Sequence, residues 1–407
     1  MKCRFCKAEL NDVFLDLGSA PPSNAYLSPA NLNEAESYFP LRLFTCRNCF
    51  LVQVDEVQKH DRIFSSDYLY FSSFSRSWLQ HAENYVNKVI ERLNMDGNSL
   101  AMEIASNDGY LLQYFKQNEI PCIGIEPTAS TAKVAREKGI ETIECFFGLQ
   151  FAEEFTAGKA PPDLIIGNNV LAHVPDVNDF VAGLARAISS EGVITIEFPH
   201  LLQLVRHGQF DTVYHEHFSY FSLHTVQKIF NAHGLRIWDV EELPTHGGSL
   251  RLWACRQTAR HKQTPAVATL LEKEAQAGML EIDYYLGFQS RADAIKNDFL
   301  AFLLQCKRDG RQVMGYGAAA KGNTLLNYAG VKPDLLSFVV DASPHKQGRY
   351  LPGSHIPVVA EDKIRELKPD YIFIFPWNLQ MEIIQQLSYV RDWGGQFVTA
   401  VPQLEIR

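Results

Sequence analysis

The sequence predicts an α/β protein in which a small cysteine-rich ribbon precedes two α/β domains. Short apolar runs alternate with helical segments from residue 100 onward and again from residue 311, which is typical of doubly wound parallel sheets. Two Cys-x-x-Cys pairs lie near the amino terminus. The 407 residues exceed the size at which a single hydrophobic core stops growing, so more than one domain is expected.

The order of these patterns predicts three domains. A ribbon over 1–62 contains the cysteine pairs and the Pro-rich insert APPSNAYLSPA. A central domain over 63–262 has the strands LAMEIA, PCIGIEP, DLIIGNN and GVITIEFP, with LRIWDVEEL and GGSLRLWACR as an antiparallel pair at its edge. A smaller, Rossmann-like α/β domain over 263–407 begins with a long helix, for which Gly287 is the expected point of a break, and continues with RQVMGYG, LLSFVVD, DYIFIFP and QFVTAVP.

Composition excludes several classes of protein. The net charge of −9 is spread without basic blocks, which argues against nucleic-acid binding. No apolar run reaches the roughly 18 residues of a membrane span. The amino terminus, MKCRFC, offers no apolar stretch for a secretion signal, so we expect a cytoplasmic protein. No unpaired apolar seam is visible, and a monomer is expected.

The cysteines near the amino terminus indicate a metal site. Cys3 and Cys6 form one Cys-x-x-Cys pair, and Cys46 and Cys49 form the other. In a reducing compartment, paired cysteines are more often metal ligands than disulfides. Two such pairs can close a tetrahedral four-thiolate zinc site, which leaves no open coordination position and is therefore structural. Structural zinc is favoured over redox chemistry and over a cluster without metal.

The segment MEIASNDGYLLQYF predicts a strand, a loop and a helix start, where doubly wound folds receive a nucleotide-like cofactor. The dinucleotide pattern G-x-G-x-x-G is absent, and no string of helix-terminal N–H groups is arranged for a pyrophosphate. A cofactor without phosphates is therefore favoured. Glu126 ends the second strand roughly 20 residues further on, where a carboxylate can bind ribose hydroxyls. The candidate loop residues are Glu103, Ala105, Asn107 and Gly109.

This set resembles the S-adenosylmethionine site of class I methyltransferases. Ala105 departs from the pattern, because the family usually has glycine at this position. The segment IIGNNVLAHVPD is similar to the fourth-strand motif of the same class. The resemblance implies that S-adenosylmethionine is the cofactor, that the central domain is a class I methyltransferase sheet, and that Asn168 and Asn169 lie near the methionine end or the substrate.

The segment VYHEHFSYFS follows the strand VITIEFP, so it caps the carboxyl ends of the strands, where α/β folds bind ligands. A solvated loop and a metal site are alternatives, but His215 and His217 would point apart on an extended segment. Acid–base chemistry is favoured for Tyr214, Glu216 and His217, because histidine can abstract a proton near neutral pH and tyrosine can donate to an oxyanion. Methyl transfer to carbon requires such groups, whereas transfer to oxygen or nitrogen needs little more than positioning.

Taken together, the four-cysteine ribbon and the segments YFSS, GNNVLAHVPD, YHEHFSYFS and GYGAAAKGNTLLN resemble the deoxysugar C-methyltransferases over nearly the whole chain. The resemblance implies methylation at carbon 3 of a nucleotide-linked 4-keto-deoxysugar through an enolate. It also implies that His217 is the general base, with Tyr214 and Glu216 ordering the site. His173 and Tyr68 match further active-site positions of the family, although a helix-capping role for His173 and a core role for Tyr68 are the alternatives. His215 is expected to be structural.

The strand–turn–helix segment VMGYGAAAKGNTLLN suits an anion at a helix N-terminus. With the family resemblance, it implies that the third domain binds the nucleotide diphosphate of the substrate. The residues expected there are Gly317, Lys321, Asn323, Asp341 and Lys346. Three alternatives remain at this point: a structural domain that covers the site, an NAD-dependent dehydrogenase that uses GYGAAAKG and Asp341, and a zinc-ribbon interaction module with a degenerate methyltransferase domain.

Overall fold

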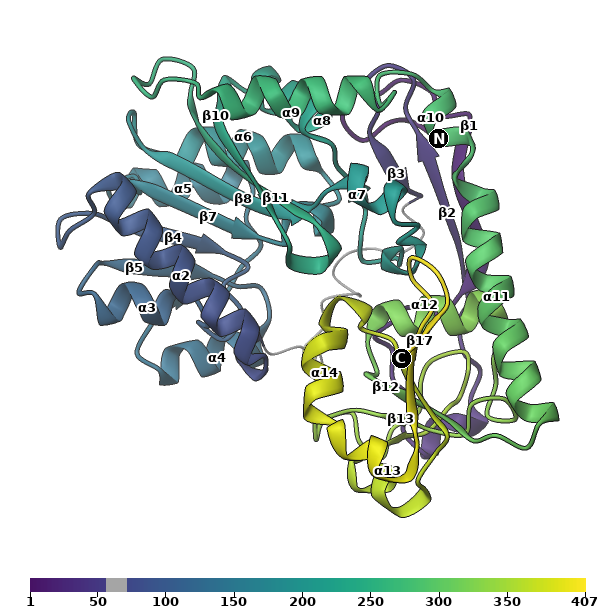
Figure 1. Ribbon diagram of the computed structural model, residues 1–407. Helices are drawn as coiled ribbons and strands as arrows, with labels where there is room; N and C mark the ends of the chain where they lie inside the picture. The colour runs from purple at the N-terminus through teal and green to yellow at the C-terminus, as the bar shows by residue number, and fades with distance from the viewer. Residues whose placement is uncertain (56–71) are drawn as a thin grey trace.

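The computed structural model describes residues 1–55 and 72–407, in which three β-sheets are covered by helices (Figure 1). The central sheet has seven strands in the order β10-β11-β8-β7-β4-β5-β6. Its parallel strands are β4 (Ala101–Ile104), β5 (Cys122–Ile125), β6 (Glu141–Ile143), β7 (Leu164–Asn168) and β8 (Val193–Pro199). The edge pair β10 (Leu235–Leu243) and β11 (Ser249–Arg256) is antiparallel, and β11 also pairs antiparallel with β8. This order is that of the expected class I methyltransferase sheet, so the predicted fold class is confirmed.

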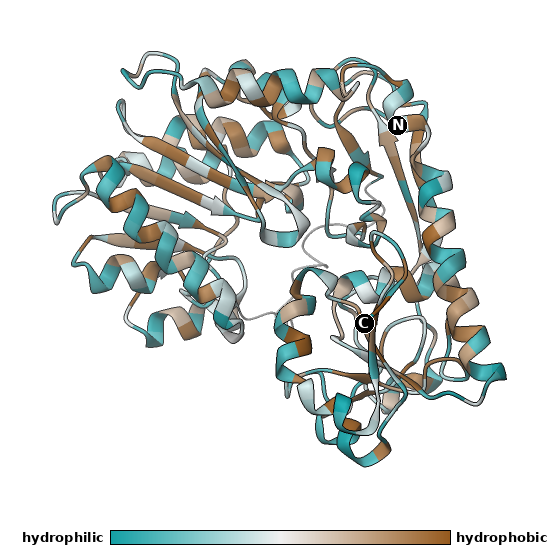
Figure 2. Cartoon of the chain, viewed as in Figure 1, coloured by the Kyte–Doolittle hydropathy of each residue, from teal (hydrophilic) through white to brown (hydrophobic). Residues whose placement is uncertain are grey.

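Helices pack on both faces of the central sheet. They are α2 (Arg76–Leu93), α3 (Leu112–Gln117), α4 (Ala129–Glu137), α5 (Leu149–Gly158), α6 (Val177–Ala187) and α8 (Leu223–Ala232). Helix α7 (Leu201–Arg206), which follows β8, packs its leucines with the core of the N-terminal sheet instead. Helix α6 begins where the Asp176 side chain accepts the backbone N–H groups of Asn178 and Asp179, which satisfies two of the donors that a helix start leaves free. The strands are the brown layer between these helices in Figure 2, as expected for a sheet buried on both faces.

The N-terminal sheet is completed by a strand from the central domain. It contains β1 (Asp12–Ala20), β2 (Phe39–Thr45), β3 (Val52–Val54) and β9 (Ser219–Tyr220) in that order. β9 pairs antiparallel with β3 through Val52 and Tyr220. The segment VYHEHFSYFS is therefore attached at its carboxyl end to the cysteine-rich domain.

The C-terminal sheet has six strands in the order β14-β13-β12-β15-β16-β17. They are β12 (Val313–Tyr316), β13 (Val339–Val340), β14 (Val358–Val359), β15 (Tyr371–Ile374), β16 (Gln396–Thr399) and the antiparallel β17 (Glu405–Ile406). Its helices are α12 (Ala320–Ala329), α13 (Asp362–Leu367) and α14 (Gln380–Gln386). The four strands predicted in this domain are present, whereas β14 and β17 were not predicted.

The long helix predicted before this sheet is interrupted twice. It comprises α9 (Pro265–Gln276), α10 (Asp283–Leu286) and α11 (Phe288–Arg308). The break at Gly287 was expected, but the first one lies at Gly278, whose φ of +91° is incompatible with an α-helix. α11 then runs along β1, where Phe14 stacks on Phe288 with ring centroids 4.7 Å apart (Figure 1). Within the described residues, no helix is both long and apolar enough to cross a membrane.

Candidate active site and zinc centre

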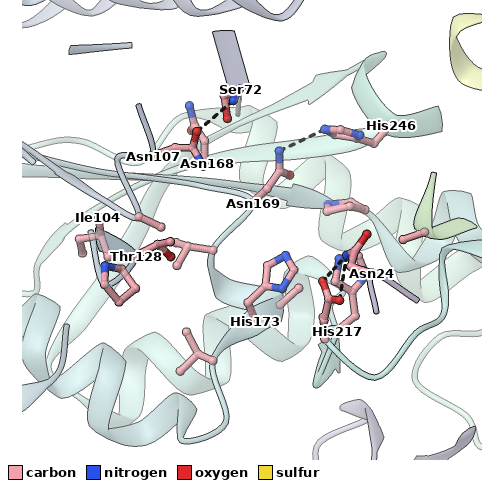
Figure 3. Close-up of a pocket in the computed structure, with 18 of the residues that line it drawn as sticks. Asn24, Ser72, Ile104, Asn107, Thr128, Asn168, Asn169, His173, His217 and His246 are labelled. Atoms are coloured by element: carbon pink, nitrogen blue, oxygen red, sulfur yellow. Dashed lines mark hydrogen bonds between the residues drawn. The ribbon is translucent and has the colours of Figure 1, made fainter. Parts of the chain in front are cut away.

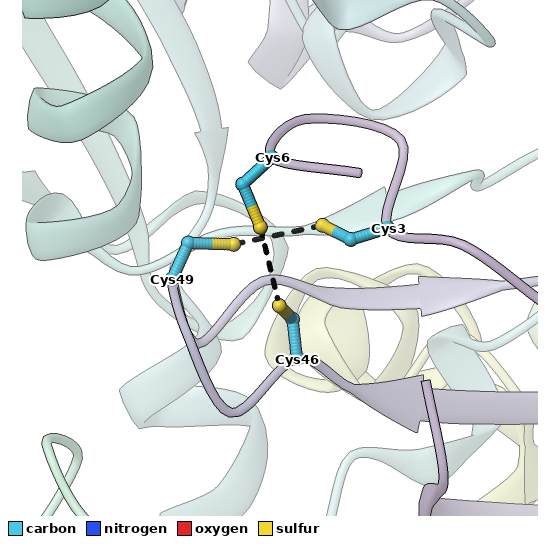
Figure 4. A group of neighbouring side chains, drawn as sticks. All are labelled: Cys3, Cys6, Cys46 and Cys49. Atoms are coloured by element: carbon cyan, nitrogen blue, oxygen red, sulfur yellow. Dashed lines mark hydrogen bonds between the residues drawn. The ribbon is translucent and has the colours of Figure 1, made fainter. Parts of the chain in front are cut away.

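The four N-terminal cysteines converge as predicted (Figure 4). Their sulfur atoms all lie within 4.8 Å of one another, with Cys3 and Cys49 at 3.6 Å and Cys6 and Cys46 at 3.5 Å. Zn–S bonds of about 2.3 Å in tetrahedral geometry separate sulfurs by roughly 3.8 Å, so the cluster fits one Zn²⁺. With four protein thiolates and no open position, the site is structural. Gln53 supports it by donating from Nε2 to Cys3 Sγ at 3.3 Å.

A cavity of about 600 Å³ lies at the carboxyl ends of the parallel strands of the central sheet (Figure 3). This volume is in the range of small-molecule sites. The loops after β4, β5, β7 and β8 form one side of it, and residues of the N-terminal insert and the C-terminal domain close the other. The cavity is therefore an interdomain site, which is a common position for a ligand in an α/β protein.

The loop after β4 forms the first wall of the cavity. Ala105 has a φ of +56° and Asn107 a φ of +50°, both in the left-handed region. The Oδ1 atom of Asn107 accepts the backbone N–H of Ser72 at 2.9 Å (Figure 3). Glu126, at the end of β5, accepts the N–H groups of Asn107 and Thr128 at 2.9 and 2.8 Å. Burial raises the pKa of Glu126.

A cofactor with a ribose fits this wall. Glu126 presents a carboxylate to the cavity, and apolar Ile104, Pro127 and Phe147 lie beside it, next to the tightly curved backbone of the β4 loop. Two of the predicted cofactor residues do not line the cavity. Glu103 is buried in β4 behind the loop, and burial raises its pKa well above the usual range. Gly109 has a φ of +74°, and a Cβ there would lie 2.5 Å from the Ile140 side chain, so this glycine serves the packing of the loop.

Asn168 and Asn169 line the cavity at the end of β7, as predicted. The Nδ2 group of Asn169 donates to Nε2 of His246 at 3.1 Å (Figure 3). Because Nε2 accepts this bond, the proton of neutral His246 is on Nδ1. Burial and the nearby Lys321 lower the pKa of His246 to about 4. The sequence analysis missed His246, which lies in the turn before β11 with a φ of +54°.

A buried ionic group holds that turn in place. Glu197 on β8 accepts hydrogen bonds from Arg251 at 2.6 Å, from His81 at 2.9 Å and from Thr245 at 2.9 Å. Burial alone would raise the pKa of Glu197, but His81 and Arg251 hold it at about 2. The Glu197 carbonyl also accepts the N–H of Asn169 at 2.8 Å. One residue thus fixes both partners of the Asn169–His246 contact.

The segment Tyr214 to His217 forms a turn whose side chains separate into two groups. Tyr214, Glu216 and His217 line the cavity. His215 is buried away from it, with Nε2 3.3 Å from the carbonyl oxygens of Phe39 and Pro40. The structure therefore gives His215 the packing position that was predicted for it.

His217 has a defined tautomer. Its Nδ1 atom lies 3.0 Å from the carbonyl oxygen of Thr212, which can only accept, so Nδ1 carries the proton and Nε2 has the lone pair. Burial, together with the proximity of His173, lowers the pKa of His217 well below the usual value. The ring centroid of His217 is 4.0 Å from that of Tyr214 and 4.7 Å from that of His173.

His173 lies beside this ring, and Glu216 lines the same cavity. Burial lowers the pKa of His173 to about 4, although a hydrogen bond with the backbone of Glu216 acts in the opposite direction. Burial raises the pKa of Glu216 to about 7, although the hydrogen bond from Asn24 lowers it. Asn24 comes from the N-terminal insert and lines the cavity, a role that the sequence analysis did not assign to it. Tyr68 lies outside the described residues.

The C-terminal domain contributes a basic wall. Lys321, on α12, donates to Asn378 Oδ1 at 2.7 Å and lies 4.5 Å from the ring centroid of Trp377. Lys346 also lines the cavity and donates to the carbonyl of Ala318 at 2.7 Å. Burial lowers the pKa of Lys321, and the buried carboxylate of Asp211 opposes this effect.

The three other predicted substrate residues of this domain do not line the cavity. Asn323 is buried and donates to the carbonyl of Ser23 in the N-terminal insert at 2.6 Å, so it joins two domains. Asp341 accepts the N–H of Ala318 at 2.8 Å and shapes the turn. Gly317 has a φ of +89°, and a Cβ there would meet Pro376 at 2.4 Å. Asn323, Asp341 and Gly317 thus support the residues of the C-terminal wall without lining the cavity themselves.

Comparisons with known proteins agree with this organisation. Three family models match the chain: a zinc binding domain over residues 3–64, a methyltransferase domain over residues 78–240, and a C-methyltransferase C-terminal domain over residues 244–402. The C-methyltransferase NovU of Streptomyces niveus is 33% identical over 405 residues, which cover 99% of this chain and 96% of that protein.

Solved structures are similar to a part of the chain. Magnesium protoporphyrin IX methyltransferase of Synechocystis PCC 6803, with bound SAH, is 15% identical with a TM-score of 0.36 and covers 44% of this chain and 83% of its own. The PH0226 protein of Pyrococcus horikoshii OT3 is 12% identical with a TM-score of 0.38 and covers 49% of this chain and 99% of its own.

Proposed function

The chain belongs to the family of S-adenosylmethionine-dependent C-methyltransferases with an N-terminal zinc-binding domain, and from this premise we propose that it methylates carbon 3 of a nucleotide-linked 4-keto-deoxysugar, with His217 as the general base. Membership of this family removes the dehydrogenase and the interaction module as alternatives for the whole chain. The substrate class is inferred from the family resemblance of the sequence and from the chemistry that the cavity can perform.

The observation that carries the proposal is the state of the His217 ring. The Thr212 carbonyl holds the proton on Nδ1, so the Nε2 lone pair is available for a carbon acid in the cavity. A depressed pKa keeps the ring neutral before the reaction. Once an enolate has formed beside it, the negative charge favours the protonated imidazole, so proton removal becomes easier when the product charge appears.

Nε2 of His217 takes the proton from carbon 3, and the C–H electron pair becomes the enolate, whose negative charge is largely on the C4 oxygen. With S-adenosylmethionine bound, the enolate carbon would form a C–C bond to its methyl group, and the electrons of the broken methyl–sulfur bond would go to sulfur. When bound, S-adenosylmethionine supplies this electrophilic methyl group.

The remaining groups of the cavity suit such a substrate. His173 and His246 are held neutral by burial, so neither adds positive charge. His246 has its N–H on Nδ1 and can donate it to a sugar oxygen, whereas His173 donates its one N–H to the backbone of Glu216 and keeps Nδ1 as an acceptor for a sugar hydroxyl. Lys321 and Lys346 give the C-terminal wall the positive charge that a nucleoside diphosphate requires. The cavity thus has a base on the central domain and a cationic wall opposite to it.

Proton exchange in deuterated buffer tests the proposal. The protein is incubated with a dTDP-4-keto-deoxysugar and S-adenosylhomocysteine, which occupies the cofactor site but carries no methyl group to transfer. We expect enzyme-dependent deuterium uptake at carbon 3 and its loss in His217→Asn. No uptake across dTDP, GDP and UDP keto-sugars would refute the substrate class, and uptake that persists in His217→Asn would refute the base.

A further inference from the structure

The two zinc knuckles have an arginine at the same position but use it differently. In Cys-Arg-Phe-Cys the side chain of Arg4 is turned inward and the residue is 8% exposed. In Cys-Arg-Asn-Cys the side chain of Arg47 is 65% exposed and pairs with Asp12 at the surface. Arg47 shows that an arginine at this position of a knuckle can stay at the surface. The knuckle sequence alone therefore does not explain why Arg4 is buried.

Arg4 is bonded at both ends of its side chain. At the backbone end, its N–H donates to Oε1 of Gln53 at 2.8 Å, and the same Gln53 donates to the thiolate of Cys3. At the guanidinium end, Nη1 donates to the carbonyl of Pro175 at 2.8 Å and Nη2 donates to the carbonyl of Val54 at 2.7 Å. The charged group also lies 5.3 Å from the ring centroid of Phe218.

These contacts reach the two segments that carry His173 and His217. Pro175 follows His173 by two residues, and Phe218 is the neighbour of His217. The two segments are joined to each other, because the Phe218 N–H donates to the carbonyl of Ala172 at 2.7 Å. β3 supports the junction, since the N–H of Val54 donates to the carbonyl of Phe218 at 3.1 Å. Arg4 thus contacts the His173 segment, the His217 segment and the strand beneath them.

We propose that Arg4 is a positioning residue that transmits the rigidity of the zinc centre to the His173–His217 pair. The inference rests on the proposed role of His217 and adds a function for the zinc-binding domain, whose four cysteines do not line the cavity. Arg4 lies between the ligands Cys3 and Cys6 in the chain, so the zinc knuckle holds its backbone. The guanidinium fork then fixes two carbonyl oxygens at once, and its planar face suits the Phe218 ring.

A lysine at position 4 cannot make both carbonyl contacts of the Arg4 guanidinium group. Its ammonium group is a point charge on a flexible stem, so it can reach one of the two carbonyl oxygens without the planar fork. Methionine has similar length but no donor, and it leaves both carbonyls without Arg4. Arg4→Lys therefore removes part of the contact and Arg4→Met removes all of its hydrogen bonds. Arg47→Lys and Arg47→Met are matched controls at the same position of the other knuckle.

The experiment compares these four variants with the wild type in zinc content, thermal unfolding, S-adenosylmethionine affinity and steady-state methylation. For Arg4→Met we expect kcat to fall on the order of 100-fold, since displacement of a reacting group by about 1 Å can have this effect. Zinc content, cofactor affinity and KM should stay close to wild type. Arg4→Lys should keep more of the wild-type kcat than Arg4→Met does. In Arg4→Met the acid limb of the kcat–pH profile should move to higher pH, because the His217 ring becomes less well buried and its pKa rises. Both Arg47 variants should match the wild type.

A measurement without substrate separates this inference from the proposed function. Amide hydrogen exchange over 171–174 and 213–222 should be faster in Arg4→Met than in Arg47→Met, whatever the substrate is. If the wild type methylates but Arg4→Met and Arg4→Lys keep full kcat, or lose it only in proportion to zinc, the inference is wrong. If the wild type acts on no keto-sugar while the exchange difference is present, the substrate proposal fails and the positioning contact stands. Equal exchange in both methionine variants overturns the contact.

Discussion

The side-chain amide of Asn24 is bonded to the carboxylate of Glu216, with Nδ2 2.8 Å from each of its oxygens. The contact joins the N-terminal insert to the turn that contains His217. One neutral amide compensates only part of the free-energy cost of burying this carboxylate. The ionised form of Glu216 is therefore held in the cavity at a cost to stability.

This cost predicts a pH-dependent effect of Glu216→Gln. The pKa of Glu216 is raised from 4.5 to about 7 in the folded protein. Between these values the folded state keeps a proton that the unfolded state has lost, so the free energy of unfolding falls as the pH rises through this window. Glu216→Gln removes this loss, and above pH 7 it should be more stable than wild type by up to about 3 kcal/mol.

Thermal unfolding at pH 4.5 and pH 8.5 checks the sign. The difference between Glu216→Gln and wild type should be small at the lower pH and favour the variant at the higher one. Glu137→Gln, on the exposed face of α4, is the matched control and should show no such dependence. A difference of the same size at both pH values would mean that Glu216 has an ordinary pKa.

His217→Asn should reduce turnover by about 100-fold or more, the usual contribution of a general base, and leave cofactor affinity unchanged. The matched control is His215→Asn, two residues earlier in the same turn. His215 does not line the cavity and contacts backbone carbonyls, so its loss should lower the unfolding temperature and spare the turnover of the folded protein. Full activity in His217→Asn, or an equal loss of turnover in both variants, would remove His217 from the mechanism.

The sequence was sufficient for features that are local. Short apolar runs predicted six of the seven strands of the central sheet, because such a run is visible within a few residues. Cysteine spacing predicted the zinc site for the same reason, and the zinc-binding and methyltransferase models agree with both. The three-residue edge strand β6, ETI, has no such run and was not predicted. The polar cluster VYHEHFSYFS pointed to the cavity, where three of its side chains lie.

Features that depend on long-range contacts could not be predicted. Asn24 is one polar residue in a proline-rich insert, and nothing near it in the sequence indicates that Glu216 is its partner. His246 lies in a turn that Glu197, on a different strand, holds through Thr245. The same holds for Arg4, whose role becomes visible only when the knuckle is seen against the His173 segment.

Glu126→Ala tests the cofactor wall. The variant loses the carboxylate that faces the cavity and the acceptor for the N–H groups of Asn107 and Thr128, which shape the loop. Since a hydrogen bond to a charged group contributes about 1.5–3 kcal/mol, S-adenosylmethionine affinity should fall at least about 10-fold. Titration calorimetry measures this directly. Glu144→Ala, an exposed carboxylate after the next strand, should bind as the wild type does, and unchanged affinity in Glu126→Ala would mean that the cofactor lies elsewhere.

Ala105 gives the last prediction, because it departs from the expected glycine at a position where glycine would be favoured. Its φ of +56° places the Cβ close to the following carbonyl, which costs an L-residue roughly 1–2 kcal/mol. Glycine avoids this strain but loses more conformational freedom on folding, by roughly 0.5–1 kcal/mol relative to alanine. Ala105→Gly should therefore leave the protein as stable as wild type or up to about 1 kcal/mol more stable.

The same substitution on an ordinary helix should have the opposite effect. Ala268 is exposed on α9, where glycine costs about 1 kcal/mol relative to alanine. Chemical denaturation of Ala105→Gly and Ala268→Gly measures both changes in the free energy of unfolding, which should have opposite signs. Ala105→Val should be clearly destabilised and bind S-adenosylmethionine weakly, since a β-branched residue adopts this backbone conformation with difficulty. If Ala105→Gly lost as much stability as Ala268→Gly, the left-handed conformation of the β4 loop would be wrong, and with it the shape of the cofactor wall.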